Sequence, residues 1–369
     1  MLPLVSALAL VLAGMALAWL VARDRRRRVR AGVRREAATF SERVRAFLED
    51  GRGSAMLAAD ADELDPSAFW SALESLDPPL RRHRMGAALR GRRGHSLGRL
   101  LAEHPHVVAE CDAVDDPSPW RRELAARRLG LVPSPPARRA LWRLLESGSE
   151  SERLAAARAL ARHRDSPALA WVLAHAGAFV HRSPRARAGL LALFGRGALP
   201  QLLEALERGT GDSAMDRAVI ECIGTLGARE ARAAHVDPRH PSAHDARFVI
   251  ERRLADPDLE TRVAAARALG RLEAEDCGNA LVASLADPEW QVRALAAWSL
   301  GRMRASIGLI ALPGRLTDPA WWVRRHAAWA LARLGEDGRE ELRKIAGGSP
   351  DPYARDMARE ALEGKLGRR

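Results

Sequence analysis

The C-terminal part of the chain repeats itself at a fixed interval, and this repetition restricts the fold more than any other feature of the sequence. The dipeptide Asp-Pro begins at residues 256, 287 and 318, a constant step of 31 residues. An arginine keeps the same step at residues 262, 293 and 324, and Arg355 continues it. A period in this range is the signature of stacked repeats. We therefore expect an elongated array in which each repeat contacts only its neighbours.

Each repeat has the pattern of two helices. Asp is a preferred N-cap and Pro fits the first helical position, so Asp-Pro predicts the start of a helix. If the arginine is numbered as position zero, small or aliphatic residues fall at +3, +4 and +7, which share one helix face. A second helix, such as residues 279–285 or 307–316, completes the pair. One pair cannot cover its own apolar face, so neighbouring pairs must stack.

The segment from Asp287 to Gly301 carries a recognisable motif, Asp-Pro-x-x-x-Val-Arg-x-x-Ala-Ala-x-x-Leu-Gly. This motif resembles the short bacterial HEAT-like repeat, which also occurs in the phycobilisome bilin-lyase family. Ankyrin and tetratricopeptide signatures of similar length are absent. The resemblance implies an all-α fold, a HEAT-like α-solenoid over residues 66–368 that is most regular over 247–347. Following the repeats along the sequence gives about eight or nine helical hairpins.

The N-terminus has the pattern of a membrane anchor. Residues 2–22 contain no charged residue and would span about 31 Å as a helix, enough to cross a bilayer. The arginines that follow predict an N-terminus outside and a cytoplasmic repeat domain, by the positive-inside rule. We expect residues 1–22 to form one transmembrane helix in the inner membrane. The alternative is a cleaved signal peptide with Ala16-Leu17-Ala18 as its cleavage site, although the basic n-region is missing.

Residues 23–35 form a basic segment next to this apolar stretch. Each arginine near an anionic surface contributes about 1 kcal/mol, so the segment could bind lipid headgroups or act only as a topology signal. Residues 36–65 are expected to be a helical stalk over 36–49 followed by a loop or linker over 50–65. The membrane-proximal basic residues are Arg23, Arg25, Arg26, Arg27, Arg28 and Arg30.

The net charge of +12 is unevenly distributed. Residues 23–35 and 80–99 each contribute +7, so the remainder sums to 12 − 14 = −2. A solenoid that binds nucleic acid or another polyanion is therefore an alternative that the charge distribution disfavours. Lysine occurs only at residues 344 and 365, an excess of arginine that indicates a GC-rich bacterial genome.

Catalytic motifs are missing from the sequence. It has no phosphate-binding glycine loop, no Gly-x-Ser-x-Gly elbow and no Cys-x-x-Cys, so we expect neither an enzyme nor a cofactor. A lyase or cofactor chaperone related to the bilin lyases is a further alternative, for which the resemblance supplies no catalytic residue. One insertion over residues 228–244 interrupts the period, and we expect an exposed loop there rather than a metal site. Its weak candidate ligands are His235, His240 and His244.

Two columns of residues on the arginine-started helices point away from the core. Position +5 lies about 160° from position +7, and position +9 falls on the same side one turn later. In solenoids of this kind the second helices line the concave surface, as the resemblance implies. We expect Trp298/Arg302 and Trp329/Arg333 at stacking distance. The predicted partner-binding residues are Arg158, Arg162, Arg267, Arg271, Trp298, Arg302, Trp329 and Arg333.

These columns predict a protein-binding scaffold or adaptor. Trp and Arg are preferred interface anchors, and Arg binds carboxylates in a bidentate manner, so acidic segments of a partner are favoured. The alternative is that Trp298 and Trp329 pack between adjacent helices as part of the core. Trp290 and Trp321, in the first helical turn, are interpreted as packing residues at the turns between repeats.

Overall fold

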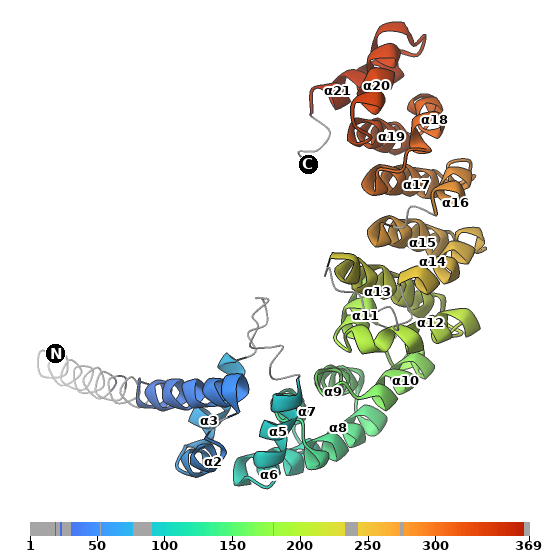
Figure 1. The fold of residues 1–369 in the computed structure, drawn as a ribbon. Coiled ribbons are helices and arrows are strands. Elements are labelled where there is room, and N and C mark those ends of the chain that lie inside the picture. Colours follow the sequence, from blue (N-terminus) through green and yellow to red (C-terminus); the bar gives the residue numbers. More distant parts are fainter. Residues whose placement is uncertain are drawn as a thin grey trace, which may run out of the picture. The chain divides into compact units, whose positions relative to one another are not determined.

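The computed structural model describes residues 19, 23, 31–51, 53–76, 91–179, 181–232, 243–273 and 277–364. All regular elements within these ranges are helices, which confirms the all-α class for the described part of the chain. Contacts divide the chain into two units, Met1–His163 and Arg164–Arg369, and each is described by itself (Figure 1). Within the described ranges no helix is both long and apolar enough to span a membrane. The predicted span over residues 2–22 lies outside them, apart from Trp19.

The first unit begins with the predicted stalk helix, which covers residues 31–50 and buries Phe40 and Val44. The loop predicted over 50–65 is wrong in its middle, because α2 (Ser54–Asp62) forms there. Leu57 and Ala61 of this helix are buried, and Asp60 forms an ion pair with Arg43 of the stalk helix. Gly51 and Gly53, which favoured a loop, therefore precede a short helix, whereas Asp60 and Asp62 lie within it.

The rest of the first unit consists of short helices and hairpins. Asp65 caps α3 by accepting a hydrogen bond from the Ser67 N–H at 2.8 Å, and Phe69 and Trp70 fill the core beneath it. The elements are α3 (Pro66–Ser75), α5 (Arg92–Leu100), α6 (Pro105–Asp112), η1 (Ala113–Asp115), α7 (Pro119–Leu129), α8 (Pro135–Ser147) and α9 (Glu150–Arg162).

The second unit is a stack of hairpins in two columns (Figure 1). Helices α13, α15, α17 and α19 lie side by side on the inner side of the bend that this unit makes, and α12, α14, α16 and α18 lie on the outer side. Consecutive helices contact each other as hairpins, in agreement with the predicted solenoid; in this unit they are α12/α13, α14/α15, α16/α17, α18/α19 and α20/α21. The elements are α10 (Ser166–Ala174), η2 (Ala176–Phe179), α11 (Pro184–Ala192), η3 (Arg196–Ala198), α12 (Leu199–Arg208), α13 (Ser213–Arg232), α14 (Ala243–Arg252), η4 (Arg253–Ala255), α15 (Leu259–Leu272), α16 (Gly278–Ser284), α17 (Trp290–Met303), α18 (Gly308–Ala311), η6 (Pro313–Thr317), α19 (Trp321–Arg333), α20 (Glu336–Gly348) and α21 (Pro352–Leu362).

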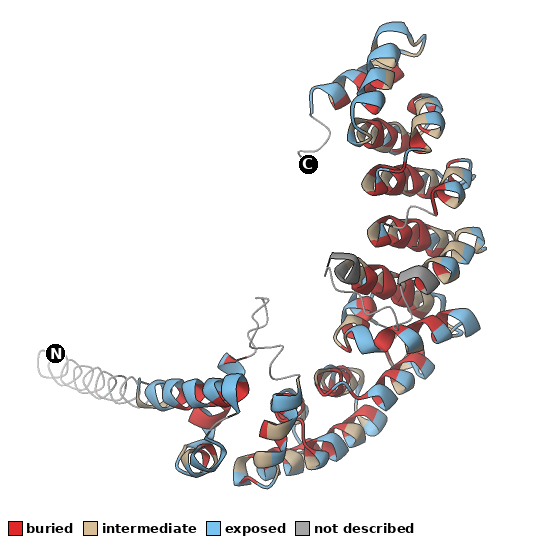
Figure 2. Ribbon diagram, viewed as in Figure 1, coloured by how far each residue is buried: buried red, intermediate tan, exposed pale blue. Residues whose placement is uncertain are grey.

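The predicted alanine stripe is buried between the inner helices. Positions +3, +4 and +7 of α17 are Ala296, Ala297 and Leu300, and none of them is exposed. The helices approach so closely that a Cβ at Gly301 would lie 2.4 Å from the Cα of Ala330 on α19. Such contacts leave α15 and α17 buried over most of their length (Figure 2).

The Asp-Pro dipeptide opens a turn rather than the helix itself, which corrects the predicted N-cap. Asp318 accepts a hydrogen bond from the Ala320 N–H at 2.9 Å, and α19 begins only at Trp321. Asp287 accepts in the same way from the Glu289 N–H at 2.8 Å. The aspartate therefore closes a tight turn of its own backbone, and its remaining acceptor capacity is available to another partner.

That partner is the position-zero arginine of the preceding repeat. Arg293 donates from Nε and Nη2 to the Asp318 carboxylate at 2.8 and 2.9 Å. Its Nη1 donates to the carbonyls of its own turn, Asp287 and Pro288, both at 2.9 Å. One guanidinium thus fixes two successive turns, with a bidentate geometry that lysine could not provide.

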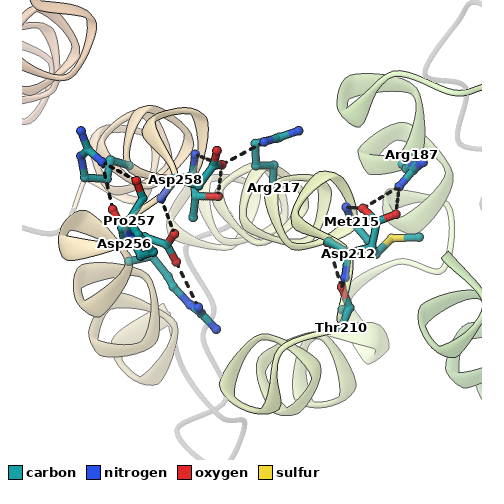
Figure 3. Close-up of polar contacts among 11 residues, drawn as sticks. Arg187, Thr210, Asp212, Met215, Arg217, Asp256, Pro257 and Asp258 are labelled. Atoms are coloured by element: carbon teal, nitrogen blue, oxygen red, sulfur yellow. Dashed lines mark hydrogen bonds and ion pairs between the residues drawn. The ribbon is translucent and has the colours of Figure 1, made fainter. Parts of the chain in front are cut away.

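Arginine–aspartate ion pairs between neighbouring hairpins recur along the second unit and form what we call the Arg–Asp ladder. Figure 3 shows two of them, Arg187–Asp212 and Arg217–Asp258, in which the arginine donates to the aspartate through Nη1. In three pairs the acid follows its arginine by 25 residues, and in the pair that spans the 228–244 insertion the separation is 41 residues. The pairs are Arg187–Asp212, Arg217–Asp258, Arg262–Asp287 and Arg293–Asp318.

Hydrogen bonds favour the charged form of three of the ladder aspartates. Burial by itself raises the pKa of the Asp318 carboxyl, but hydrogen bonds from Arg293 and the Ala320 N–H outweigh it and hold the pKa below its usual value. The same balance lowers the pKa of Asp212 and Asp258. The hydrogen bond to Asp318 raises the pKa of the Arg293 guanidinium. Each pair therefore stabilises the contact between neighbouring hairpins as an ion pair.

Candidate partner-binding surface

Two tryptophans lie parallel on the inner face of α17 and α19. The ring centroids of Trp298 and Trp329 are 6.3 Å apart, with an interplanar angle of 8°. Both side chains are half-buried, so the indoles contact each other between helices but are not part of a closed core. This contact between neighbouring helices agrees with the alternative in which the two tryptophans pack between repeats, and their partial exposure leaves part of each ring accessible. Their role in binding remains a prediction.

An arginine lies over each indole, as the spacing predicts. The Arg302 guanidinium is 5.5 Å from the Trp298 ring centroid, and the Arg333 guanidinium is 4.9 Å from that of Trp329. Each arginine also donates a hydrogen bond to the neighbouring inner helix of the preceding repeat. Arg302 Nε donates to the Gly270 carbonyl of α15 at 2.9 Å. Arg333 Nε donates to the Gly301 carbonyl at 3.2 Å. These bonds fix the guanidinium groups beside the rings before any partner binds.

Beside the tryptophans, α15 contributes two further arginines. Arg267 forms an ion pair with Glu221 of α13 at 3.1 Å. Arg271 is half-buried and has no hydrogen-bond or ion-pair partner among the residues that the structure describes. Burial lowers the pKa of Arg271, repulsion from Arg267 and Arg302 lowers it further, and Glu221 opposes this. The inner face thus holds an uncompensated positive charge.

We call the six residues of these three helices the Arg/Trp surface. They share a helix face and a unit of the structure, so the repeat period has placed them side by side. The members are Arg267, Arg271, Trp298, Arg302, Trp329 and Arg333.

The other two predicted partner-binding residues belong to the first unit. Arg158 is exposed and Arg162 is half-buried, and both lie on α9. They are therefore not counted in the Arg/Trp surface, and their predicted role is untested.

The interpretation of Trp290 and Trp321 as packing residues is wrong. These residues are 40% and 41% exposed, although each begins its helix, α17 and α19. Trp322 and Tyr353 are also exposed, and sequence reasoning missed both. The signal in the sequence was that both are aromatic and both stand two residues before a position-zero arginine, 31 residues apart. Sequence reasoning equally missed the Arg–Asp ladder, whose signal was the recurring separation of 25 residues.

The remaining predicted sites fall largely outside the described ranges. His235 and His240 are not described, and of His244 only the backbone is. Elsewhere, in the described residues, no group of three His, Cys, Asp or Glu side chains could hold a metal ion. Of the basic segment only Arg23 is described, and it lies over the Trp19 ring at 5.1 Å. The five other basic residues, Arg25 to Arg28 and Arg30, lie outside the described residues.

Comparisons with known proteins identify the repeats. The family model for HEAT repeats matches residues 246–312 and 278–363. No curated protein matches the chain. Solved structures similar to it include Kap121p bound to Pho4p, with 14% identity, a TM-score of 0.42, and coverage of 88% of this chain and 43% of that one.

Two further solved structures match this chain over nearly their whole length. The archaeal HEAT-like repeats protein from Thermococcus onnurineus NA1 has 14% identity and a TM-score of 0.32, covering 70% of this chain and 97% of that one. Human deoxyhypusine hydroxylase in complex with glycerol has 17% identity and a TM-score of 0.29, covering 88% and 96%. At these identities and TM-scores the likenesses carry no argument about activity or partners. The chain thus has HEAT-like repeats, with residues 246–363 matching the HEAT-repeat model, in a HEAT-like α-solenoid.

Proposed function

We propose that this protein is a membrane-anchored scaffold that binds a protein partner on the Arg/Trp surface. The observation that supports this most directly is the pair of half-buried, parallel indoles of Trp298 and Trp329, each with a guanidinium over its ring. Packing of the stack does not require indoles at these outward positions, because the core is closed by alanine and leucine. Trp and Arg are also the residues most enriched at the centres of protein interfaces.

The surface is rigid before it binds. Arg302 and Arg333 are each held by a hydrogen bond to a backbone carbonyl, and the two rings restrict each other by stacking. Ordering a flexible side chain on binding costs about 0.5–1.5 kcal/mol. A surface whose side chains are already ordered avoids most of that cost, so more of its contact energy contributes to affinity.

The partner segment is expected to be acidic where it crosses α15. Arg271 is half-buried and is repelled by Arg267 and Arg302, while Glu221 is already paired with Arg267. A carboxylate from a partner would compensate this charge with charge-assisted hydrogen bonds. Apolar side chains of the same segment would then pack against the two indoles.

A double substitution tests the proposal. The partner is first identified by crosslinking in membranes and pull-down. Trp298→Ala with Trp329→Ala should then weaken its affinity at least about thirtyfold, since a hot-spot tryptophan contributes about 2 kcal/mol or more. The helical circular dichroism should stay unchanged. Trp120→Ala, which removes a 64% exposed tryptophan of the first unit, is the matched control and should bind normally. If the double variant loses its helical signal, the indoles are core residues and the proposal fails.

The same charges could attract nucleic acid, and a salt series separates the two functions. Nonspecific binding to DNA weakens steeply and linearly with the logarithm of salt concentration. Binding to a protein partner through the tryptophans should depend on salt only weakly. Tight DNA binding with a steep salt slope that survives removal of both tryptophans would replace the proposed function.

We also propose that residues 2–22 anchor the chain in the inner membrane with the repeats in the cytoplasm. The support is the uncharged stretch followed directly by arginines. Deletion of residues 1–22 should move the chain from carbonate-washed membranes to the soluble fraction. Added protease should digest the repeats in inverted vesicles only. Digestion in right-side-out vesicles, or membrane retention of the deletion variant, would contradict the anchor or its orientation.

A further inference from the structure

The Arg–Asp ladder lacks its acid at one position. Arg324 donates from Nη1 to the Asp318 and Pro319 carbonyls at 2.8 and 3.0 Å, as Arg293 does in the preceding repeat. The next turn, however, begins with Ser349 in place of an aspartate. Its hydroxyl accepts from the Asp351 N–H at 3.3 Å, so the serine closes the turn but supplies no carboxylate.

The guanidinium of Arg324 is consequently half satisfied. Its Nε is shielded from solvent and has no hydrogen-bond partner among the described residues. In Arg262 and Arg293 this same nitrogen donates to an aspartate at 2.9 and 2.8 Å. The preceding repeats therefore show the geometry in which Arg324 would bind a carboxylate.

Exposed aromatic residues lie near Arg324 in the chain and on the next helix pair. The ring of Tyr353 lies over the guanidinium at 5.2 Å and is 65% exposed. Trp321 and Trp322 are 41% and 47% exposed and meet edge to face at 4.7 Å. Exposed aromatic groups that are contiguous mark interaction sites rather than ordinary surface.

This aromatic group continues the Arg/Trp surface. Trp322 and Trp329 are separated by seven residues on α19, which places them on the same helix face. Trp322 and Arg324 both lie in the first turn of α19, so a segment that crosses Trp322 and Trp329 also passes this turn. The two sites can contribute to one interface.

We propose that Arg324 binds the carboxylate of an Asp or Glu side chain of the partner, which replaces the aspartate missing at position 349. The inference rests on the proposed function and specifies the partner's chemistry. Apolar side chains beside that acid pack on Trp321, Trp322 and Tyr353. A carboxylate fits better than a phosphate, because planar carboxylates fill the equivalent position on Arg262 and Arg293.

The test uses a substitution that supplies the acid from within the chain. Ser349→Asp places a carboxylate where Asp287 and Asp318 stand in the preceding repeats, so it should occupy Arg324 and exclude a partner's acid. The variant completes a stabilising contact, so it is expected to fold. Ser306→Asp adds the same charge at an exposed position after α17 and is the matched control.

The probe is a displayed library of random peptides, selected on the full-length chain in an uncharged detergent. Selected peptides should contain an acid next to an aromatic or aliphatic residue. Ser349→Asp should weaken their binding roughly tenfold by fluorescence anisotropy, the loss expected for one charge-assisted hydrogen-bonded pair. Changing the peptide's acid to its amide should weaken binding to the wild type by a similar factor. It should have no effect on binding to Ser349→Asp.

Three results overturn the inference: equal affinity for wild type and Ser349→Asp, an equal cost of the acid-to-amide change in both, or selected peptides without an acid. Its failure is distinguishable from failure of the proposed function. Peptides that require Trp298 and Trp329 but ignore Ser349→Asp leave the proposed function standing. Peptides that respond to Ser349→Asp but not to loss of the two tryptophans place binding at Arg324 alone.

Discussion

Replacing Asp318 by serine tests whether the Arg–Asp ladder holds the hairpins together. The change copies the arrangement found naturally at Ser349, where a hydroxyl closes the turn without a carboxylate. The turn should therefore persist, with the serine hydroxyl accepting from the Ala320 N–H. Only the ion pair with Arg293 is lost.

The magnitude follows from the geometry of this pair. Two hydrogen bonds of 2.8 and 2.9 Å join side chains that are 3% and 13% exposed, so water screens them little. Hydrogen bonds to charged groups contribute about 1.5–3 kcal/mol each, and Arg293 keeps its two bonds to the Asp287 and Pro288 carbonyls. We expect a destabilisation of about 3–5 kcal/mol, the range known for breaking a buried pair.

Urea denaturation followed by circular dichroism measures this loss. Urea is preferred because guanidinium chloride would screen the ion pair. The transition should shift to lower urea with little change in slope. Asp318 has a pKa below its usual value, so its contribution is complete above the unfolded-state pKa near 4 and is lost as pH falls through the folded-state pKa. The difference between variant and wild type should therefore shrink under acid.

A second aspartate-to-serine substitution, at an exposed ion pair, is the matched control for Asp318→Ser. Asp356→Ser removes a carboxylate whose pair with Arg359 is largely exposed, at 66% and 56%, and should change stability by less than about 0.5 kcal/mol. If Asp318→Ser is no more destabilising than this control, or if its effect persists unchanged at low pH, the ladder does not stabilise the stack as an ion pair.

Two further substitutions probe other contacts. Gly301→Ala should destabilise the protein by about 1–3 kcal/mol in the same assay, because the added Cβ meets the backbone of α19. The control is Gly347→Ala, which adds its Cβ in open space within a helix and should stabilise slightly. Equal effects of the two substitutions would refute the close approach of α17 and α19. Glu152→Gln should cost about 1–2 kcal/mol at neutral pH, since Glu152 caps α9 and pairs with Arg122 at 2.6 Å. That cost should fall as pH drops, because Glu152 has a lowered pKa, and a pH-independent cost would contradict its assignment to the ion pair.

The repeat period predicted the fold because each repeat encodes the same buried positions. Counting from one arginine was enough to place the alanine stripe, the outward columns and the stacking of Arg302 and Arg333 on their tryptophans. These features depend only on helical periodicity, which the sequence contains directly.

The contacts that the sequence did not reveal are those between repeats. Asp318 was interpreted as a helix cap because local preference favours that role, whereas its carboxylate binds an arginine of the preceding hairpin. The exposure of Trp290 and Trp321 depends on how closely neighbouring repeats cover the first turn of each helix, which helical periodicity does not encode. Helix α2 was missed because its burial depends on distant helices rather than on its own composition.

Arginine has two separate roles in this array, and its position in the repeat decides between them. At position zero, Arg293 is fixed on both sides by one turn and the next, so it contributes stability and is closed to partners. At position +9, Arg302 lies over an indole on the open face and can contribute to recognition. Arg324 combines both, since half of its guanidinium fixes a turn and the other half lacks an acid. An array can gain a binding site at low structural cost by omitting one aspartate, because the serine preserves the turn and leaves a preorganised guanidinium beside exposed aromatic rings.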